Sequence, residues 1–224
     1  PHAVGQFNAK QLIPDEPMIV ILTKGIYIKR LHPGVYSTQA RGGKGVIGIT
    51  TKEEDEIQQI LHTRTHNELL YFTSRGRVYR LPVYEIPQAS RTARGIPIIN
   101  LLQLGKDEDV TAMLDDNQMK GEYLFMATSR GTVKKTKTED FKNVRKSGLI
   151  AIKLRDGDLL QWVRSTSAGN QVMMVTYEGK GIRFKESDVR PMGRPSMGVR
   201  GIKLRGTDQV VQMDAFRASA GPAK

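Results

Sequence analysis

The chain has 224 residues, 38% of them apolar, and contains no cysteine, which excludes disulfides and thiolate metal sites and is compatible with a cytoplasmic protein. No run of about 18 apolar residues occurs, so the sequence predicts neither a membrane-spanning helix nor a membrane partner. Lys and Arg number 35 against 23 Asp and Glu, and the resulting net charge of +12 favours a polyanionic partner, most often nucleic acid.

Four apolar runs along the chain each lead into a short polar turn that contains glycine. Glycine is expected near the end of a tight hairpin turn, where a positive φ is common. The pattern therefore predicts four β-hairpins, repeated at intervals of about 50 residues. The runs and their glycines are Met18–Leu22 with Gly25, Leu69–Phe72 with Gly76, Tyr123–Ala127 with Gly131, and Val172–Val175 with Gly179.

A second glycine-led frame follows each hairpin at a similar interval, and an acidic residue precedes the next apolar run. The frames are Gly45–Ile49, Gly95–Ile99, Gly148–Ile152 and Gly198–Ile202, and the acids are Asp55, Asp109, Asp158 and Asp208. The last apolar run of each repeat reads as a strand. In the first repeat Glu53–Leu61 also shows helical spacing, but its counterparts in the third and fourth repeats favour a strand there.

These repeats predict an all-β, propeller-like fold of about four blades with roughly 50 residues each. The predicted blades cover residues 18–62, 69–114, 123–166 and 172–216 of a single domain at 18–216. Residues 1–17 are expected to lead into this domain, and residues 217–224 are expected to form a disordered tail.

The residue four positions after each hairpin glycine is basic in every repeat: Lys29, Arg80, Lys135 and Arg183. Because side chains alternate along a strand, a common register would place these four side chains on the same face of every blade. We therefore include them among the candidate DNA contacts.

A bulky apolar residue follows the second strand of each hairpin, and a loop with two positive charges comes next. The apolar residues, predicted to lie in the core, are Tyr36, Ile86, Phe141 and Val189. The basic pairs are Arg41 and Lys44, Arg91 and Arg94, Arg145 and Lys146, and Arg190 and Arg194. Repeated basic loops predict a positive rim that contacts duplex-DNA phosphates independently of sequence. The alternative is that these charges are merely solvated.

Other patterns fit the sequence less well. Gly43–Gly48 spells a dinucleotide-binding motif, but a charged loop precedes it and a β-rich segment follows. His62 and His66 have a spacing compatible with metal binding on a helix, but their segment is predicted to be a strand. Aromatic residues make up only 6% of the chain and are not interleaved with the basic loops, which disfavours stacking of single-stranded bases.

The first basic loop reads Gln39-Ala40-Arg41-Gly42-Gly43-Lys44-Gly45. It resembles the signature box of the C-terminal domain of bacterial DNA gyrase A subunits, Gln-Arg-Arg-Gly-Gly-Lys-Gly, and differs from it at Ala40, where the family has arginine. The likeness extends from about Leu12 to Met213 and includes Arg75–Tyr79, Gly131–Lys135, Arg183–Ser187 and Gly198–Ile202.

The resemblance implies a β-pinwheel, in which neighbouring blades exchange strands and a basic rim wraps double-stranded DNA. Gln39, Arg41, Gly42, Gly43, Lys44 and Gly45 would be the box residues here. The domain would be non-catalytic and need no cofactor, because the catalytic tyrosine and the sites for ATP and Mg lie elsewhere in the topoisomerase. Its partners would be DNA, the remainder of gyrase A and the gyrase B subunit, in the bacterial cytoplasm at the nucleoid.

Two alternatives stay open. A topoisomerase IV C-terminal domain would bend DNA without strong wrapping, and both Ala40 and the count of four repeats, where gyrase domains usually carry six, leave room for it. A propeller scaffold that binds acidic protein partners would use the same positive charge, although a basic residue in every blade argues against it.

Overall fold

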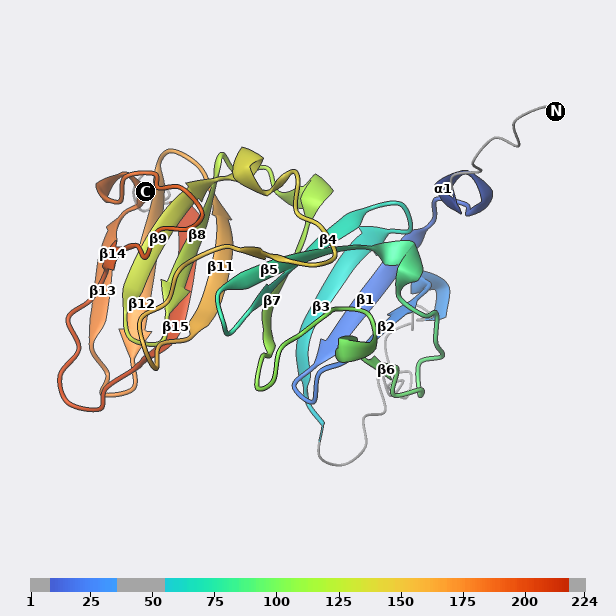
Figure 1. The fold of residues 1–224 in the computed structure, drawn as a ribbon, viewed down its shortest axis with the longest axis horizontal. Helices are drawn as coiled ribbons and strands as arrows, with labels where there is room; N and C mark the ends of the chain where they lie inside the picture. Colours follow the sequence, from blue (N-terminus) through green and yellow to red (C-terminus); the bar gives the residue numbers. More distant parts are fainter. Residues whose placement is uncertain (1–8, 36–54, 218–224) are drawn as a thin grey trace, which may run out of the picture. The chain divides into compact units, whose positions relative to one another are not determined.

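The computed structural model describes residues 9–35 and 55–217. Tyr36, the box at Gln39–Gly45 and the tail after Arg217 lie outside these ranges. The described chain is all-β, as predicted, with one short helix, α1 (Ala9–Leu12), and single turns of 3-10 helix (Figure 1). No helix in the described ranges is long and apolar enough to cross a membrane.

The strands form four small antiparallel sheets, which we name A to D in chain order. Sheet A has the order β3-β1-β2-β6, sheet B β10-β5-β4-β7, sheet C β11-β8-β9-β14, and sheet D β13-β12-β15. The bounds are β1 (Pro17–Thr23), β2 (Tyr27–Leu31), β3 (Ile57–Arg64), β4 (Glu68–Thr73), β5 (Arg77–Pro82), β6 (Ile96–Pro97), β7 (Val110–Asp115), β8 (Tyr123–Thr128), β9 (Thr132–Lys137), β10 (Leu149–Ile150), β11 (Leu160–Thr166), β12 (Asn170–Thr176), β13 (Gly181–Lys185), β14 (Val199–Arg200) and β15 (Val210–Arg217).

Each sheet combines a hairpin with the last strand of its own repeat, and sheets A to C each gain a short strand from the following repeat. These donated strands are β6, β10 and β14, and they begin the glycine-led frames noted in the sequence. The segment with ambiguous spacing in the first repeat is strand β3, as predicted. Among the described strands, none pairs with β13 on its outer side, so sheet D has an open edge there.

The contacts within the chain divide it into two compact units. One contains the chain up to Leu69 together with Leu81–Gln103, and the other contains Leu70–Arg80 and the chain from Leu104 onward. Sheet A belongs to the first unit, where Val20, Leu22, Ile28 and Leu31 are fully buried.

In the second unit, apolar side chains fill the spaces between successive sheets. Leu70, Phe72 and Val78 of sheet B pack with Leu124 and Met126 of sheet C in one cluster. On the other face of β8, Phe125 and Ala127 pack with Val172 and Met174 of sheet D. In Figure 1 the strands of sheets C and D, coloured yellow-green to red, lie next to each other. Both faces of β8 are therefore buried, while the far face of β12 leaves Met173 exposed.

The hairpin turns reveal a one-residue difference in register between the first repeat and the other three. Gly76, Gly131 and Gly179 have φ between 74° and 79°, but in the first hairpin the positive φ belongs to Ile26, at 57°, and not to Gly25. The amide of each of these four residues donates to the carbonyl of a threonine that ends the preceding strand: Thr23, Thr73, Thr128 and Thr176. Threonine is thus the correct marker for aligning the repeats.

This register corrects the predicted set of equivalent basic residues. Aligned on the threonines, the counterpart of Arg80, Lys135 and Arg183 is Arg30, whereas Lys29 is the counterpart of Lys134. Pairing agrees, because Lys29 lies opposite Ile21 and Lys134 lies opposite Met126 at the same place in each hairpin. A slip of one residue moves a side chain to the other face of a sheet, so Lys29 and Arg80 do not share a face.

Candidate nucleic-acid interface

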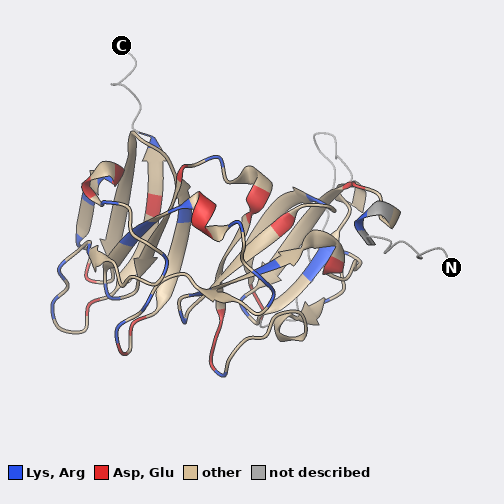
Figure 2. Ribbon diagram, turned by 45° about the horizontal axis from the view of Figure 1, so that its top comes forward, with Lys and Arg blue, Asp and Glu red and all other residues tan. Residues whose placement is uncertain are grey.

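The three described basic loops each lie between a buried apolar residue and the glycine-led strand of the same repeat. The apolar residues Ile86, Phe141 and Val189 are at most 5% exposed, which confirms their prediction as core residues. The basic residues of the loops are Arg91, Arg94, Arg145, Lys146, Arg190 and Arg194; Arg91 and Arg194 are half-buried and the other four are exposed. Figure 2 shows Lys and Arg in the loops and also on strands inside the sheets, and these two groups have different surroundings.

Most of the loop arginines keep their charge available to an external anion. Within residues 9–35 and 55–217, no carboxylate pairs with Arg91, Arg145, Arg190 or Arg194. Arg94 differs, because its guanidinium carbon lies 3.6 Å from the centroid of the Tyr27 ring. This contact leaves the charge of Arg94 uncompensated while holding the side chain against sheet A.

The loops of the second and fourth repeats rest on the preceding repeat in the same way. The amide of Arg30 on β2 donates to Pro87 O at 3.1 Å, and Arg30 O accepts from Ala89 N at 2.9 Å. In the fourth repeat, Met192 N donates to Lys135 O of β9 at 2.8 Å. Arg91 and Arg194 are equivalent, since each lies at the same distance in sequence from the buried apolar residue before it and from the frame glycine after it.

The glycine at the end of each of these two loops allows the loop backbone to pass close to the strand beneath it. Gly198 has φ of +88°, and a Cβ on it would lie 2.5 Å from Val133 O. Gly95 has φ of +90°, and its Cβ would lie 2.4 Å from Ile28 O. Any side chain at these positions would both strain the backbone and collide with the strand beneath.

All four basic residues predicted four positions after the hairpin glycine contact protein groups. Arg80 contacts Asp116 at 2.9 Å and Phe141 O at 2.9 Å, and Lys135 is 4% exposed and pairs with Glu186 at 2.9 Å. Arg183 is exposed, hydrogen-bonds Gln171 and lies 5.5 Å from the Phe216 ring. The fourth, Lys29, is 3% exposed. Lys29 and Lys135 therefore do not present their charge at the surface.

Lys29 and Lys134 share a position one residue before that of Arg80 and Lys135. The sequence pattern did not distinguish these two positions. Lys29 Nζ donates to the backbone oxygens of Arg91 at 2.8 Å and Ala93 at 2.6 Å, with Ser90 O at 3.4 Å. Lys134, which is fully buried, donates to Ala151 O at 2.7 Å and to Arg194 O. Burial lowers the pKa of Lys29, and burial together with the positive charge of Arg194 lowers the pKa of Lys134 to about 8. Aligning the repeats on the threonines would have revealed this pair from sequence.

The repeated acids fix the hairpin turns. Asp158 accepts from the Thr128 hydroxyl at 2.7 Å and from Arg130 N at 3.0 Å, and Asp208 accepts from Glu178 N at 3.1 Å. Burial opposes the charged form of Asp208, but hydrogen bonds from Glu178, Thr176 and Lys180 outweigh it and lower its pKa.

In the second repeat the acid that binds the threonine is Glu108, and the prediction of Asp109 is wrong. Glu108 is 6% exposed and accepts from the Thr73 hydroxyl at 2.6 Å, whereas Asp109 is exposed. Glu108 has the same place relative to Val110 as Asp158 has relative to Leu160. Its longer side chain still reaches the threonine, so the repeat tolerates either acid.

The described residues offer little else for ligand chemistry. No group of three or more His, Cys, Asp or Glu in the described ranges could hold a metal, and His66 Nε2 lies 2.6 Å from Ile13 O.

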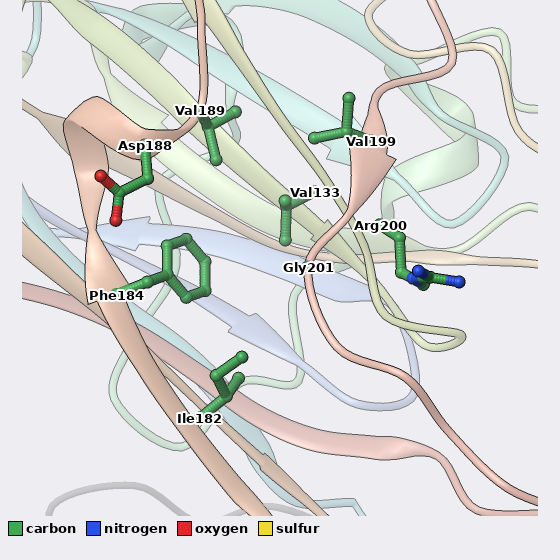
Figure 3. Close-up of a pocket in the computed structure, with 8 residues that line it drawn as sticks. All are labelled: Val133, Ile182, Phe184, Asp188, Val189, Val199, Arg200 and Gly201. Atoms are coloured by element: carbon green, nitrogen blue, oxygen red, sulfur yellow. The ribbon is translucent and has the colours of Figure 1, made fainter.

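A pocket of about 190 Å³ opens beside the free edge of β13, with Ile182 and Phe184 on one side and Val199 on the other (Figure 3). Its walls are mainly apolar. The box residues, the remaining candidate contacts, lie outside the described residues.

Comparison with known proteins gives one consistent result. The sequence model of the family described as "DNA gyrase C-terminal domain, beta-propeller" matches residues 17–64, 67–114, 122–167 and 170–217. The chain is 47% identical over 207 residues to the DNA gyrase A protein of Escherichia coli (strain K12), covering 92% of this chain and 24% of the relative. It is 44% identical over 201 residues to the DNA gyrase A protein of Clostridium acetobutylicum, covering 89% of this chain and 24% of the relative.

Two solved structures are similar over most of the chain. The C-terminal domain of a DNA topoisomerase IV superposes with a TM-score of 0.77 at 29% identity, covering 92% of this chain and 63% of that one. A DNA gyrase A C-terminal domain superposes with a TM-score of 0.66 at 29% identity, covering 89% of this chain and 65% of that one. The chain thus spans about a quarter of the length of the curated relatives that it matches.

Proposed function

We propose that this chain, which belongs to the family of DNA gyrase C-terminal domains, binds duplex DNA through its phosphates and wraps or bends it. The observation that carries the proposal is the repetition of loop arginines without carboxylate partners, with Arg91 and Arg194 at equivalent positions on the same backbone support. Phosphate contacts repeated along a contour follow the path of a duplex and carry no base information. The binding is therefore independent of sequence.

The loop residues Arg91, Arg94, Arg145, Lys146, Arg190 and Arg194 are the proposed contacts, together with exposed Arg183 and the box residues Gln39, Arg41, Gly42, Gly43, Lys44 and Gly45. Lys29, Arg80 and Lys135 are left out because their charged groups bind protein atoms. Duplex is favoured over single strands because stacking of bases needs aromatic rings among the basic loops, and aromatic residues make up only 6% of the chain.

In the larger protein the domain would serve a type II topoisomerase without catalysing a step itself. By holding a DNA segment, it would present a crossing to the cleavage core, formed by the remainder of gyrase A with gyrase B, and so support ATP-dependent negative supercoiling. The catalytic tyrosine, ATP and Mg would belong to those parts, and the assembly would act on DNA in the bacterial cytoplasm.

A second candidate is the corresponding domain of a topoisomerase IV, which would bend DNA without strong wrapping. One observation favours it: at equal sequence identity, the topoisomerase IV domain superposes better than the gyrase domain. The sequence relatives and the box favour gyrase.

A plasmid-relaxation experiment distinguishes these functions. A nicked circular plasmid is incubated with increasing amounts of the chain, ligated and deproteinised, and its linking number is read on a gel. A shift of one sign that grows with protein supports wrapping, while salt-sensitive binding without a shift supports the topoisomerase IV function. An absence of salt-sensitive binding would overturn both. The double substitution Arg91→Ala and Arg194→Ala should reduce the shift, whereas Arg155→Ala, an exposed arginine outside the basic loops, should not.

A further inference from the structure

We propose that Lys29 and Lys134 are positioning residues for DNA binding: each holds, from inside the protein, the backbone of an arginine that contacts phosphate. The inference rests on the proposed function and names the residues on which its geometry depends. Neither lysine touches the DNA. Each lysine acts on the basic loop of the following repeat. Lys29 holds the backbone of Arg91, and Lys134 holds the backbone of Arg194.

Two equivalent lysines reach two equivalent carbonyl groups. Lys29 and Lys134 share one position in the hairpin when the repeats are aligned on Thr23 and Thr128. Lys29 binds Arg91 O at 2.8 Å, and Lys134 binds Arg194 O. The same contact is therefore made twice, in separate units of the chain, between matching partners.

The repeat of sheet B lacks the lysine. The residue at this position is Tyr79, whose hydroxyl donates to Glu108 at 3.3 Å. The loop that follows sheet B, from Phe141 to Gly148, is also shorter than the loops from Ile86 to Gly95 and from Val189 to Gly198. A lysine is thus present where the loop is long and absent where the loop is short.

An ammonium group offers three donors and can gather several carbonyl oxygens that would otherwise lack partners in the interior. Carbonyl groups do not cancel its charge, and no carboxylate pairs with Lys29 or Lys134 among the described residues. Lys135 provides the contrast, because Glu186 neutralises it.

A double-mutant cycle on DNA affinity tests the proposal. The first cycle comprises Lys134→Met, Arg194→Ala and the double variant of these two. The second comprises Lys29→Met, Arg91→Ala and their double variant. Binding of a duplex of mixed sequence is measured over a range of salt concentrations. Each single variant should bind more weakly and lose about 1 from the slope of log K against log salt. Each combination should bind no more weakly than its arginine variant alone, because the lysine acts through that arginine.

A purely structural lysine would give a different result. Its substitution would then reduce affinity by the same factor with or without the arginine, and this additivity would overturn the proposal. Tyr79→Phe is the matched control, since it alters the same position of the repeat, removes only the hydroxyl that binds Glu108 and keeps the ring that lies against Gly148. It should lower stability and leave the affinity of the folded protein unchanged. If the unaltered chain shows no salt-dependent binding, the proposed function fails. If it binds and the cycles are additive, only this inference fails.

Discussion

At the scale of single residues, the last three hairpin turns depend on a pair formed by a threonine and a buried acid. Each threonine that ends the first strand accepts from the amide four residues later, as Thr128 does from Thr132 at 3.0 Å. The acid binds the threonine hydroxyl, and Asp158 also binds a free amide of the turn. A carboxylate is suited to this role because it only accepts hydrogen bonds and can serve several donors at once.

Removing one of these acids should therefore be costly. Asp158→Ala leaves the donors of Thr128, Ser129 and Arg130 without their acceptor in a buried turn, and we expect a loss of about 3 kcal/mol in the free energy of unfolding. Urea denaturation measures it. Asp109→Ala, which alters an exposed acid, should stay within about 0.5 kcal/mol of the unaltered chain. Equal losses for the two variants would contradict the assigned roles.

The pKa of Lys134 predicts a pH dependence of stability. Its pKa is about 8 in the folded protein and near the ordinary 10.5 in the unfolded chain. Between these values the unfolded state binds more protons, so this residue makes the free energy of unfolding rise as the pH increases from about 8 toward 10.5. Denaturant unfolding at several pH values should show the rise in the unaltered chain and a smaller one in Lys134→Met. Identical pH profiles would refute the assignment.

At the scale of elements, the exchange of short strands connects consecutive repeats. Strands β6, β10 and β14 each make a two-residue pairing, which would be weak in isolation. They are supported by the glycine before each of them and by the loop that rests on the preceding hairpin. The loops that carry the arginines are thus fixed at both ends by the repeat before them.

The glycine before β14 supplies a direct test of this connection. Gly198→Ala introduces a Cβ at φ of +88° and 2.5 Å from Val133 O, so it should destabilise the protein by about 2 kcal/mol or more. Gly193→Ala in the same loop is the control, because its Cβ would meet no atom closer than 3.9 Å. Thermal and urea unfolding compare the two, and a neutral Gly198→Ala would show that the close approach is not required.

At the scale of the whole molecule, the net charge of +12 is distributed between two roles. Lys29, Arg80, Lys134 and Lys135 on the strands bind carbonyl or carboxylate groups of the protein, while the loop arginines and the exposed Arg183 remain available for phosphate. Only the second group should contribute to the release of counterions when DNA binds.

The salt dependence of DNA binding follows from this division. If about eight loop charges, including Arg41 and Lys44 of the box, neutralise phosphates, log K should fall with log salt at a slope of about −7. Fluorescence anisotropy with a labelled duplex measures the slope. Lys106→Ala, at an exposed position outside the basic loops, should leave the slope unchanged, and a slope near zero would contradict phosphate binding.

The sequence by itself determined the all-β fold, the fourfold period, the buried residues after the last three hairpins and the basic loops there. These depend on local patterns: alternation along strands, glycine in turns, and charge in loops. The box residues Arg41 and Lys44 identified the family resemblance in the same way, from a contiguous motif.

Only the tertiary structure decided which basic residues face solvent. Gly25 misled the alignment because Ile26 adopts the positive φ in that hairpin, and a shift of one residue exchanges the two faces of a strand. The arginines whose carbonyl groups Lys29 and Lys134 bind lie 62 and 60 residues away in sequence, in a loop that folds back over the preceding hairpin. Such contacts are fixed by packing between repeats, and local sequence carries no direct record of them.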